Sequence, residues 1–149
     1  MVEGKVVLTQ AHRPLRQLVA TTGSGHHLIL DDIIGGTGPQ PIELVAVSLA
    51  GCTAFDVISH LRYKRFQQVT AYEVRVEAEQ ADNSPQVFTS VRIHHILAGP
   101  EIDPDAVNEA IELSNNRHGA VYAMLRPSTS LTTSFEILVE MASAVAATQ

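Results

Sequence analysis

Hydrophobic and polar positions change their spacing several times along the chain, and each change marks an expected element. Residues 3–10, 14–22 and 26–31 are short runs of β-favouring residues, separated by Arg13-Pro14 and by the turn sequence at 22–25. These three runs predict an antiparallel meander at the N-terminus. A loop rich in glycine and proline follows at 35–41.

The longest apolar run predicts one helix over about 41–66. Pro41 suits the first turn of a helix, and Glu43 suits the positive end of the helix dipole. The run is apolar nearly all round, which is typical of a helix that is covered on more than one side. Because Glu43, Asp56 and His60 interrupt it, we expect a core helix rather than a membrane span.

The second half of the chain returns to a period of two. Residues 70–79 and 87–97 alternate around a turn at 82–85, which predicts a β-hairpin. Asp103 followed by Pro104 predicts a capped helix that runs to about Arg117, with a second helical piece at 120–125. A last strand is expected at 129–139 and a weakly ordered tail at about 140–149.

The expected order is therefore βββ-α-ββ-αα-β, an α+β fold with antiparallel sheet segments around a long central helix. We expect one domain over 1–149. The long helix separates the N-terminal meander from the later strands. A second subunit would supply the meander with a covering face, so the order favours a homodimer.

Composition and charge narrow the function. Hydrophobic residues make up 45% of the chain and charged residues 17%, and tryptophan is absent, which indicates an aliphatic core and a partly apolar surface. The net charge of −6, with no basic patch, argues against nucleic-acid binding. The N-terminus lacks the pattern of a signal peptide, so we expect a cytoplasmic protein. The single cysteine excludes an intramolecular disulfide.

That cysteine, Cys52, lies within the long apolar helix and is the main candidate for chemistry. A thiol there is either an inert core residue or a nucleophile in a dry pocket. Ser48 and Asp56 lie one turn before and after it on the same face, whereas Glu43 is nine residues away and projects from the opposite side. We expect Asp56 to be structural, for example in an ion pair with an arginine of the sheet (Arg75 or Arg92).

The histidines are weaker candidates. His26 and His118 are possible proton donors or cations, and the alternative for each is an ordinary surface or core residue. The adjacent pairs at 26–27 and 94–95 would point to opposite faces of their strands, so no metal site is expected. No dinucleotide fingerprint or P-loop is present, and no cofactor is expected. A Ser–His–Asp triad is not marked by any motif.

The run from Gly35 to Leu44, followed by Ser48-Leu-Ala-Gly-Cys-Thr-Ala-Phe-Asp56, resembles the OsmC/Ohr family of thiol-dependent peroxidases, in particular its OsmC-like branch. Shorter matches lie upstream at 22–26 and downstream at 113–114, 123–125 and 132–135. The resemblance implies an intertwined homodimer with active sites at the subunit interface. It also implies reduction of organic hydroperoxides by a peroxidatic cysteine, which Cys52 matches, and a nearby glutamate, which Glu43 matches.

The sequence departs from this family at two positions. The family's resolving cysteine lies in a segment that here reads His118-Gly119-Ala120-Val121, so Gly119 stands at its place. The arginine that Ohr-type members bring from the meander is also absent, and His26 stands in its region. An external thiol or dithiol would then be the reductant. The alternatives are a non-enzymatic dimer of the same fold that binds an apolar ligand or senses redox state, and, more distantly, a thioesterase.

Overall fold

The computed structural model describes residues 1–9 and 16–139. The chain forms two compact units, Met1–Val47 and Ser48–Gln149, and each is described by itself. The single domain expected over 1–149 therefore stays a prediction. The expected tail at 140–149 lies outside the described residues.

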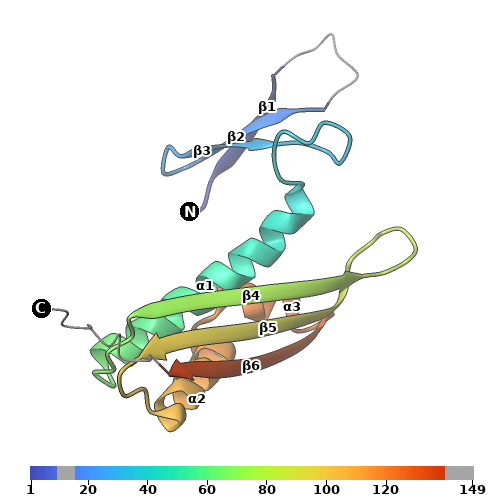
Figure 1. Ribbon diagram of the computed structural model, residues 1–149. Coiled ribbons are helices and arrows are strands. Elements are labelled where there is room, and N and C mark those ends of the chain that lie inside the picture. Colours follow the sequence, from blue (N-terminus) through green and yellow to red (C-terminus); the bar gives the residue numbers. More distant parts are fainter. Residues whose placement is uncertain (10–15, 140–149) are drawn as a thin grey trace, which may run out of the picture. The chain divides into compact units, whose positions relative to one another are not determined.

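The N-terminal unit contains the expected meander. Its strands are β1 (Gly4–Leu8), β2 (Leu18–Thr22) and β3 (His27–Leu30), and both neighbouring pairs are antiparallel, in the order β1-β2-β3 (Figure 1). All five residues of β1 are exposed, including Val6, Val7 and Leu8. Among the described residues of this unit, nothing covers the apolar side chains of β1.

The long helix α1 spans Pro41–Tyr63. Glu43 is the third helical residue, and its Oε2 accepts the backbone N–H of Gln40, the residue before the helix, at 2.7 Å. This contact is one half of a capping box, which satisfies a backbone donor that would otherwise have no helical partner. The helix ends three residues before the expected boundary. Lys64 and Arg65 both donate to the carbonyl of His60, and Phe66 takes a positive φ of 51°.

The sheet of the C-terminal unit contains β4 (Ala71–Gln80), β5 (Phe88–Gly99) and β6 (Ser130–Val139), in the order β4-β5-β6. The β4–β5 hairpin is antiparallel, as expected. The β5–β6 pair is parallel, so the sheet is mixed rather than wholly antiparallel. The reason is the helical connection between β5 and β6, which returns the chain to the starting end of the sheet.

That connection begins with α2 (Pro104–Leu113), which Asp103 caps by accepting the N–H of Asp105 at 3.0 Å. The cap and the proline at N1 agree with the expectation, but the α-helix does not run to Arg117. Its last part is a π-helical turn, η1 (Ser114–His118), closed by the Gly119 N–H on the Ser114 carbonyl at 2.7 Å. A short helix, α3 (Ala120–Leu125), follows as expected.

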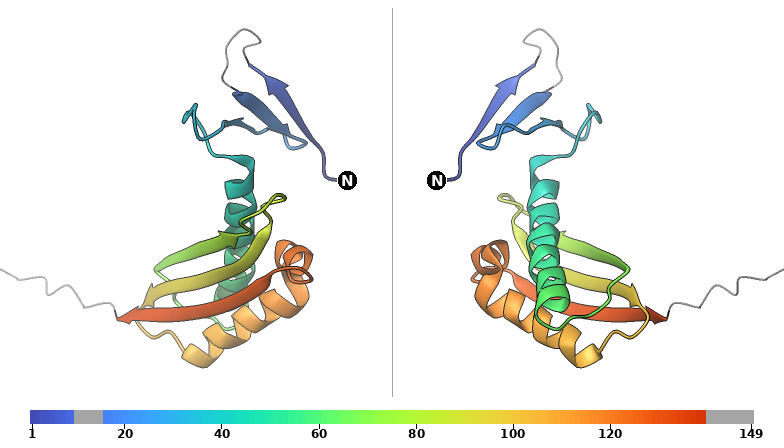
Figure 2. Two further views of the ribbon diagram at one scale, coloured as in Figure 1. Left: turned by 90° about the vertical axis from the view of Figure 1, so that its right-hand side faces the viewer. Right: turned by 90° about the vertical axis from the view of Figure 1, so that its left-hand side faces the viewer.

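The helices cover one face of this sheet, as Figure 2 shows for α1 and α2. The core between them is aliphatic, and its members come from α1, the following loop, β5 and α2: Val57, Leu61, Val69, Leu97, Ala106, Val107, Ala110 and Ile111. Burying each of the larger side chains contributes about 1.5–3 kcal/mol. The other face of the sheet is largely polar and carries ion pairs such as Arg92–Glu77 at 3.0 Å.

Candidate functional site

Cys52 lies near the middle of α1 and is partly exposed. The buried residues of the helix, Leu49, Thr53, Val57 and Leu61, follow the spacing of a single stripe that packs on the sheet. The side chain of Phe55, nearly one turn after Cys52, is 77% exposed. Cys52 therefore flanks the buried stripe and is not an enclosed core thiol.

Beneath α1 the C-terminal unit holds a group of buried and half-buried polar side chains. The Ser114 hydroxyl donates to Asp56 Oδ2 at 3.0 Å and lies 3.3 Å from Thr53 Oγ1. The prediction that Asp56 pairs with a sheet arginine is wrong. Strand alternation turns Arg75 and Arg92 to the opposite face, where they pair with Glu73 and with Glu77 and Glu79.

Two aromatic side chains extend this polar group into the sheet. The Tyr72 hydroxyl and His95 Nδ1 are 2.7 Å apart, and the two rings stack with centroids 5.9 Å apart. Burial, reinforced by the charge of His94, lowers the pKa of His95 to about 4. Burial, reinforced by the Asp56 carboxylate, raises the pKa of Tyr72. Both groups are therefore neutral at pH 7.

The sequence does not mark His95 as a site residue; it shows His95 only as one of two adjacent histidines. The structure confirms that the pair points to opposite faces: His95 is fully buried, whereas His94 contacts Ser134 and Glu136 on the other face. His95 Nε2 has no hydrogen-bond partner among the described residues. The only sequence signal was a histidine at an inward position of an otherwise apolar strand.

Gly119 stands in a crowded place. A Cβ atom there would lie 2.8 Å from the Ser114 carbonyl oxygen and 3.1 Å from the Tyr122 Cβ. The π-helical turn brings that carbonyl onto the Gly119 N–H, which explains the crowding. A cysteine introduced at this position would need the backbone to shift before it could form a disulfide.

His26 and Glu43, the two site residues expected beside Cys52, belong to the N-terminal unit. His26 is exposed beside the β2–β3 turn, where its Nδ1 lies 3.0 Å from Ser24 Oγ. Glu43 is exposed, and its carboxylate caps the first turn of α1 as described above. The local structure therefore gives each of them a structural contact.

The glycine loop of this unit is organised by a carboxylate that the sequence did not single out. Asp31 is buried and accepts hydrogen bonds from the backbone N–H groups of Asp32 and Thr37 and from the Thr37 hydroxyl. These contacts, led by the Thr37 hydroxyl, lower the pKa of Asp31. A Cβ at Gly35 would overlap the Asp31 carboxylate, so the glycine is needed there.

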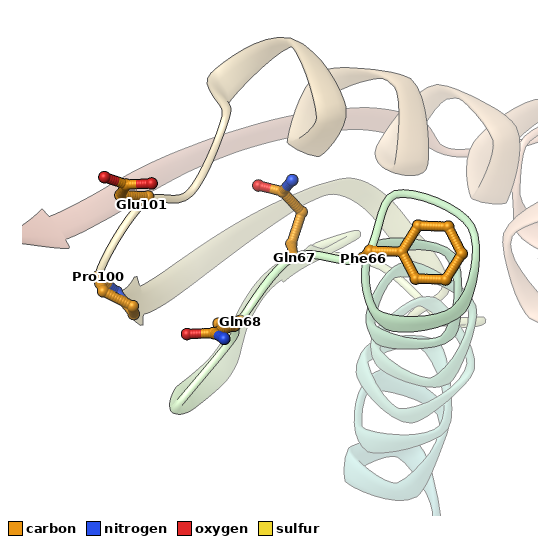
Figure 3. A pocket seen from close by; sticks show the side chains of 5 residues that line it. All are labelled: Phe66, Gln67, Gln68, Pro100 and Glu101. Atoms are coloured by element: carbon orange, nitrogen blue, oxygen red, sulfur yellow. The ribbon is translucent and has the colours of Figure 1, made fainter.

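A cavity of about 290 Å³ lies along the second half of α1. Its lining combines acidic, basic, imidazole and hydroxyl groups: Asp56, Ser59, His60, Tyr63, Lys64 and His118. A larger cavity of about 510 Å³ lies past the end of α1 (Figure 3). It is lined by Phe66, Gln67, Gln68, Pro100 and Glu101, a set without a nucleophile or a base other than Glu101.

Residues 1–9 and 16–139 contain no group of three or more His, Cys, Asp or Glu side chains placed to hold a metal ion.

Comparison with known proteins gives a match between residues 34–134 and the model of the family described as OsmC-like protein. The chain belongs to the OsmC-like protein family. The matched range includes both Cys52 and Gly119.

Among curated proteins, the chain is 33% identical to protein YhfA of Escherichia coli strain K12 over 117 residues, which cover 78% of this chain and 87% of YhfA. A crystal structure of a hypothetical protein from Aquifex aeolicus VF5 has a TM-score of 0.81 at 24% identity and covers 94% of this chain and 98% of that one. The organic hydroperoxide resistance protein OhrB of Bacillus subtilis has a TM-score of 0.61 at 15% identity, with 91% and 98% covered. These two structures support the expected OsmC-like fold.

Among the described residues, α1 is the one helix whose length and composition are sufficient to cross a membrane. Core helices of soluble proteins can have the same length and apolar composition, and α1 buries one stripe of side chains against the sheet. Proteins of the OsmC-like family are soluble. The helix therefore gives no ground for a membrane assignment.

Proposed function

We propose that this OsmC-like protein is a thiol-dependent peroxidase that reduces organic hydroperoxides through Cys52. The observation that carries the proposal is the position of Cys52: a partly exposed thiol on α1, beside the buried stripe, within the matched family range. The naming of OhrB for organic hydroperoxide resistance adds support from a protein of the same fold.

The first step is attack of the Cys52 thiolate on the O–O bond of the hydroperoxide. The S–O bond forms as the O–O bond breaks, the alkoxide leaves and takes a proton, and Cys52 becomes a sulfenic acid. Glu43 and His26, from the N-terminal unit, are proposed as the groups that orient the peroxide and supply that proton. Because Glu43 projects from the opposite side of α1, we propose that it acts on the Cys52 of the other subunit. Because the chain contains no second thiol, an external thiol must reduce the sulfenic acid.

We further propose a cytoplasmic homodimer with one OsmC-like domain over 1–149. Exposed apolar side chains on both units support it, among them Val6 and Val7 on β1 and Val47 and Phe55 on α1. Light scattering at micromolar concentration is expected to give twice the chain mass of 16.1 kDa. A monomer at that concentration would contradict the proposal.

The enzymatic test is turnover of cumene hydroperoxide with dithiothreitol. We expect Cys52→Ser to abolish turnover with little loss of stability because the change is nearly isosteric, and Ser128→Ala, on an exposed loop, serves as the control. Equimolar peroxide should give a trappable sulfenic acid, and excess peroxide should add two oxygens irreversibly. Full activity of Cys52→Ser, or an unchanged mass after peroxide treatment, would refute the peroxidase.

A second function is favoured by one specific observation, the glycine at position 119. Without a resolving cysteine, a dimer of this fold can serve as a redox sensor or as a binder of apolar ligands. Oxidation of Cys52 by peroxide, with no turnover by any thiol or dithiol, would support the sensor. An unreactive Cys52 would support ligand binding.

A further inference from the structure

The cavity beside α1 extends the stripe of helix surface on which Cys52 lies. Positions 52, 56, 59 and 63 are three or four residues apart, so their side chains share one side of the helix. Three of these four residues, Asp56, Ser59 and Tyr63, line the cavity. Its wall therefore begins one helical turn, about 6 Å, from Cys52.

The cavity has opposite charges at its two ends. Asp56 is at the end near Cys52, and Lys64, the residue directly after α1, is eight positions further on, about 12 Å at the rise of a helix. The Asp56 carboxylate accepts the Ser114 hydroxyl at 3.0 Å. Within the described part of the chain, Lys64 makes no ion pair, whereas the next residue, Arg65, pairs with Glu109 at 2.6 Å.

Further polar groups of the lining also lack partners. His60 Nε2 is buried without a hydrogen bond within residues 1–9 and 16–139, with the Glu109 carboxylate 3.6 Å away. The His118 side chain is exposed and makes no hydrogen bond in the same part of the chain, and the residue directly precedes Gly119. A buried polar atom without a partner is costly, so a ligand that supplies a hydrogen bond to His60 Nε2 would bind favourably.

We propose that this cavity binds the external reductant, and that the reductant is a peptide-sized thiol with a carboxylate remote from its sulfur. Lys64 attracts the carboxylate and Asp56 repels it, so the thiol end is directed toward Cys52. The distance of about 12 Å between the positions of Asp56 and Lys64 corresponds to three or four extended peptide residues. The volume of about 290 Å³ is at the lower end of small-molecule pockets. The inference rests on the proposed peroxidase function.

The reduction then takes two steps. The ligand thiol ionises, and its thiolate attacks the sulfur of the Cys52 sulfenic acid. The S–O bond breaks, the departing hydroxide takes up the proton released by the thiol and leaves as water, and a mixed disulfide forms. A second thiol molecule attacks the ligand sulfur of this disulfide and releases the Cys52 thiolate and a symmetric disulfide. In total, one hydroperoxide and two thiols give one alcohol, one water and one disulfide.

The kinetic test compares glutathione with its glycine ethyl ester, which differs in one carboxylate, and with neutral 2-mercaptoethanol. We expect kcat/KM for glutathione to exceed that for the ester about fivefold, the range of one exposed ion pair. Lys64→Gln should reduce this ratio to about one. Arg126→Gln removes the same charge from an exposed residue outside the cavity lining and should keep the ratio.

A binding measurement separates this inference from the peroxidase itself. Calorimetric titration with S-methylglutathione, which cannot react, should show binding that Lys64→Gln weakens about fivefold and Arg126→Gln does not. Turnover with 2-mercaptoethanol, together with equal kcat/KM for glutathione and its ester, would overturn the inference and leave the peroxidase standing. If no thiol supports turnover, the peroxidase fails and the titration alone decides: lysine-dependent binding supports the cavity, and no binding at millimolar concentration overturns it.

Discussion

Acid should destabilise the protein through His95. The folded chain holds the pKa of this imidazole at about 4, because burial penalises the charged form and the nearby His94 charge adds to that effect. In the unfolded chain the pKa is about 6.5. Between these values only the unfolded chain is protonated, so stability is fully present above pH 6.5 and is lost as the pH falls toward 4.

The two pKa values fix the magnitude. Protonation of the unfolded chain alone lowers the free energy of unfolding by about 2 kcal/mol between pH 7 and pH 4.5. Other titrating groups add their own terms, so the informative quantity is the difference between wild type and His95→Leu at each pH. His95→Leu leaves the Tyr72 hydroxyl without its hydrogen-bond partner, so its free energy of unfolding at pH 7 is lower than that of wild type. This loss of stability does not change with pH.

Urea unfolding followed by circular dichroism, at several pH values from 7 to 4.5, measures this difference. We expect wild type to lose about 2 kcal/mol more than His95→Leu over that range. Tyr72→Phe should keep the wild-type pH dependence because the imidazole stays buried. Parallel curves for wild type and His95→Leu would refute the burial argument.

Three further changes test the packing around the proposed site. Leu97→Ala should lower the free energy of unfolding by about 2–5 kcal/mol in urea because Leu97 is fully buried between sheet and helices, and a loss below 1 kcal/mol would contradict that packing. Ser114→Ala should cost about 1.5–3 kcal/mol by removing the donor to the Asp56 carboxylate, and Asp56→Asn in the same background should then add little. Gly35→Ala should lower the melting temperature because its Cβ would meet the Asp31 carboxylate, and an unchanged melting temperature would show that the loop can adapt.

The candidate site was predictable only in part. Cys52 was identified because its neighbours in sequence carry the family motif, and residues on one helix face follow directly from a spacing of 3.6 per turn. The sequence placed Asp56 on the correct face of α1, but the predicted ion pair with an arginine of the sheet was wrong. Whether it meets an arginine or Ser114 depends on which face of the sheet the helix covers. The contact between Tyr72 and His95 joins neighbouring strands, and no local pattern specifies it.

The sequence determined by itself the order of the elements, the N-terminal meander, the β4–β5 hairpin, the start of α1 and the cap of α2, because turns, alternation and capping residues act over a few positions. Tertiary structure decided the parallel pairing of β6, the π-helical turn before Gly119, and the burial of His95 and Asp31. Each depends on where a distant segment packs. A backbone carbonyl redirected by one turn, or a side chain enclosed by another element, changes hydrogen bonding and pKa in ways that residue order alone does not specify.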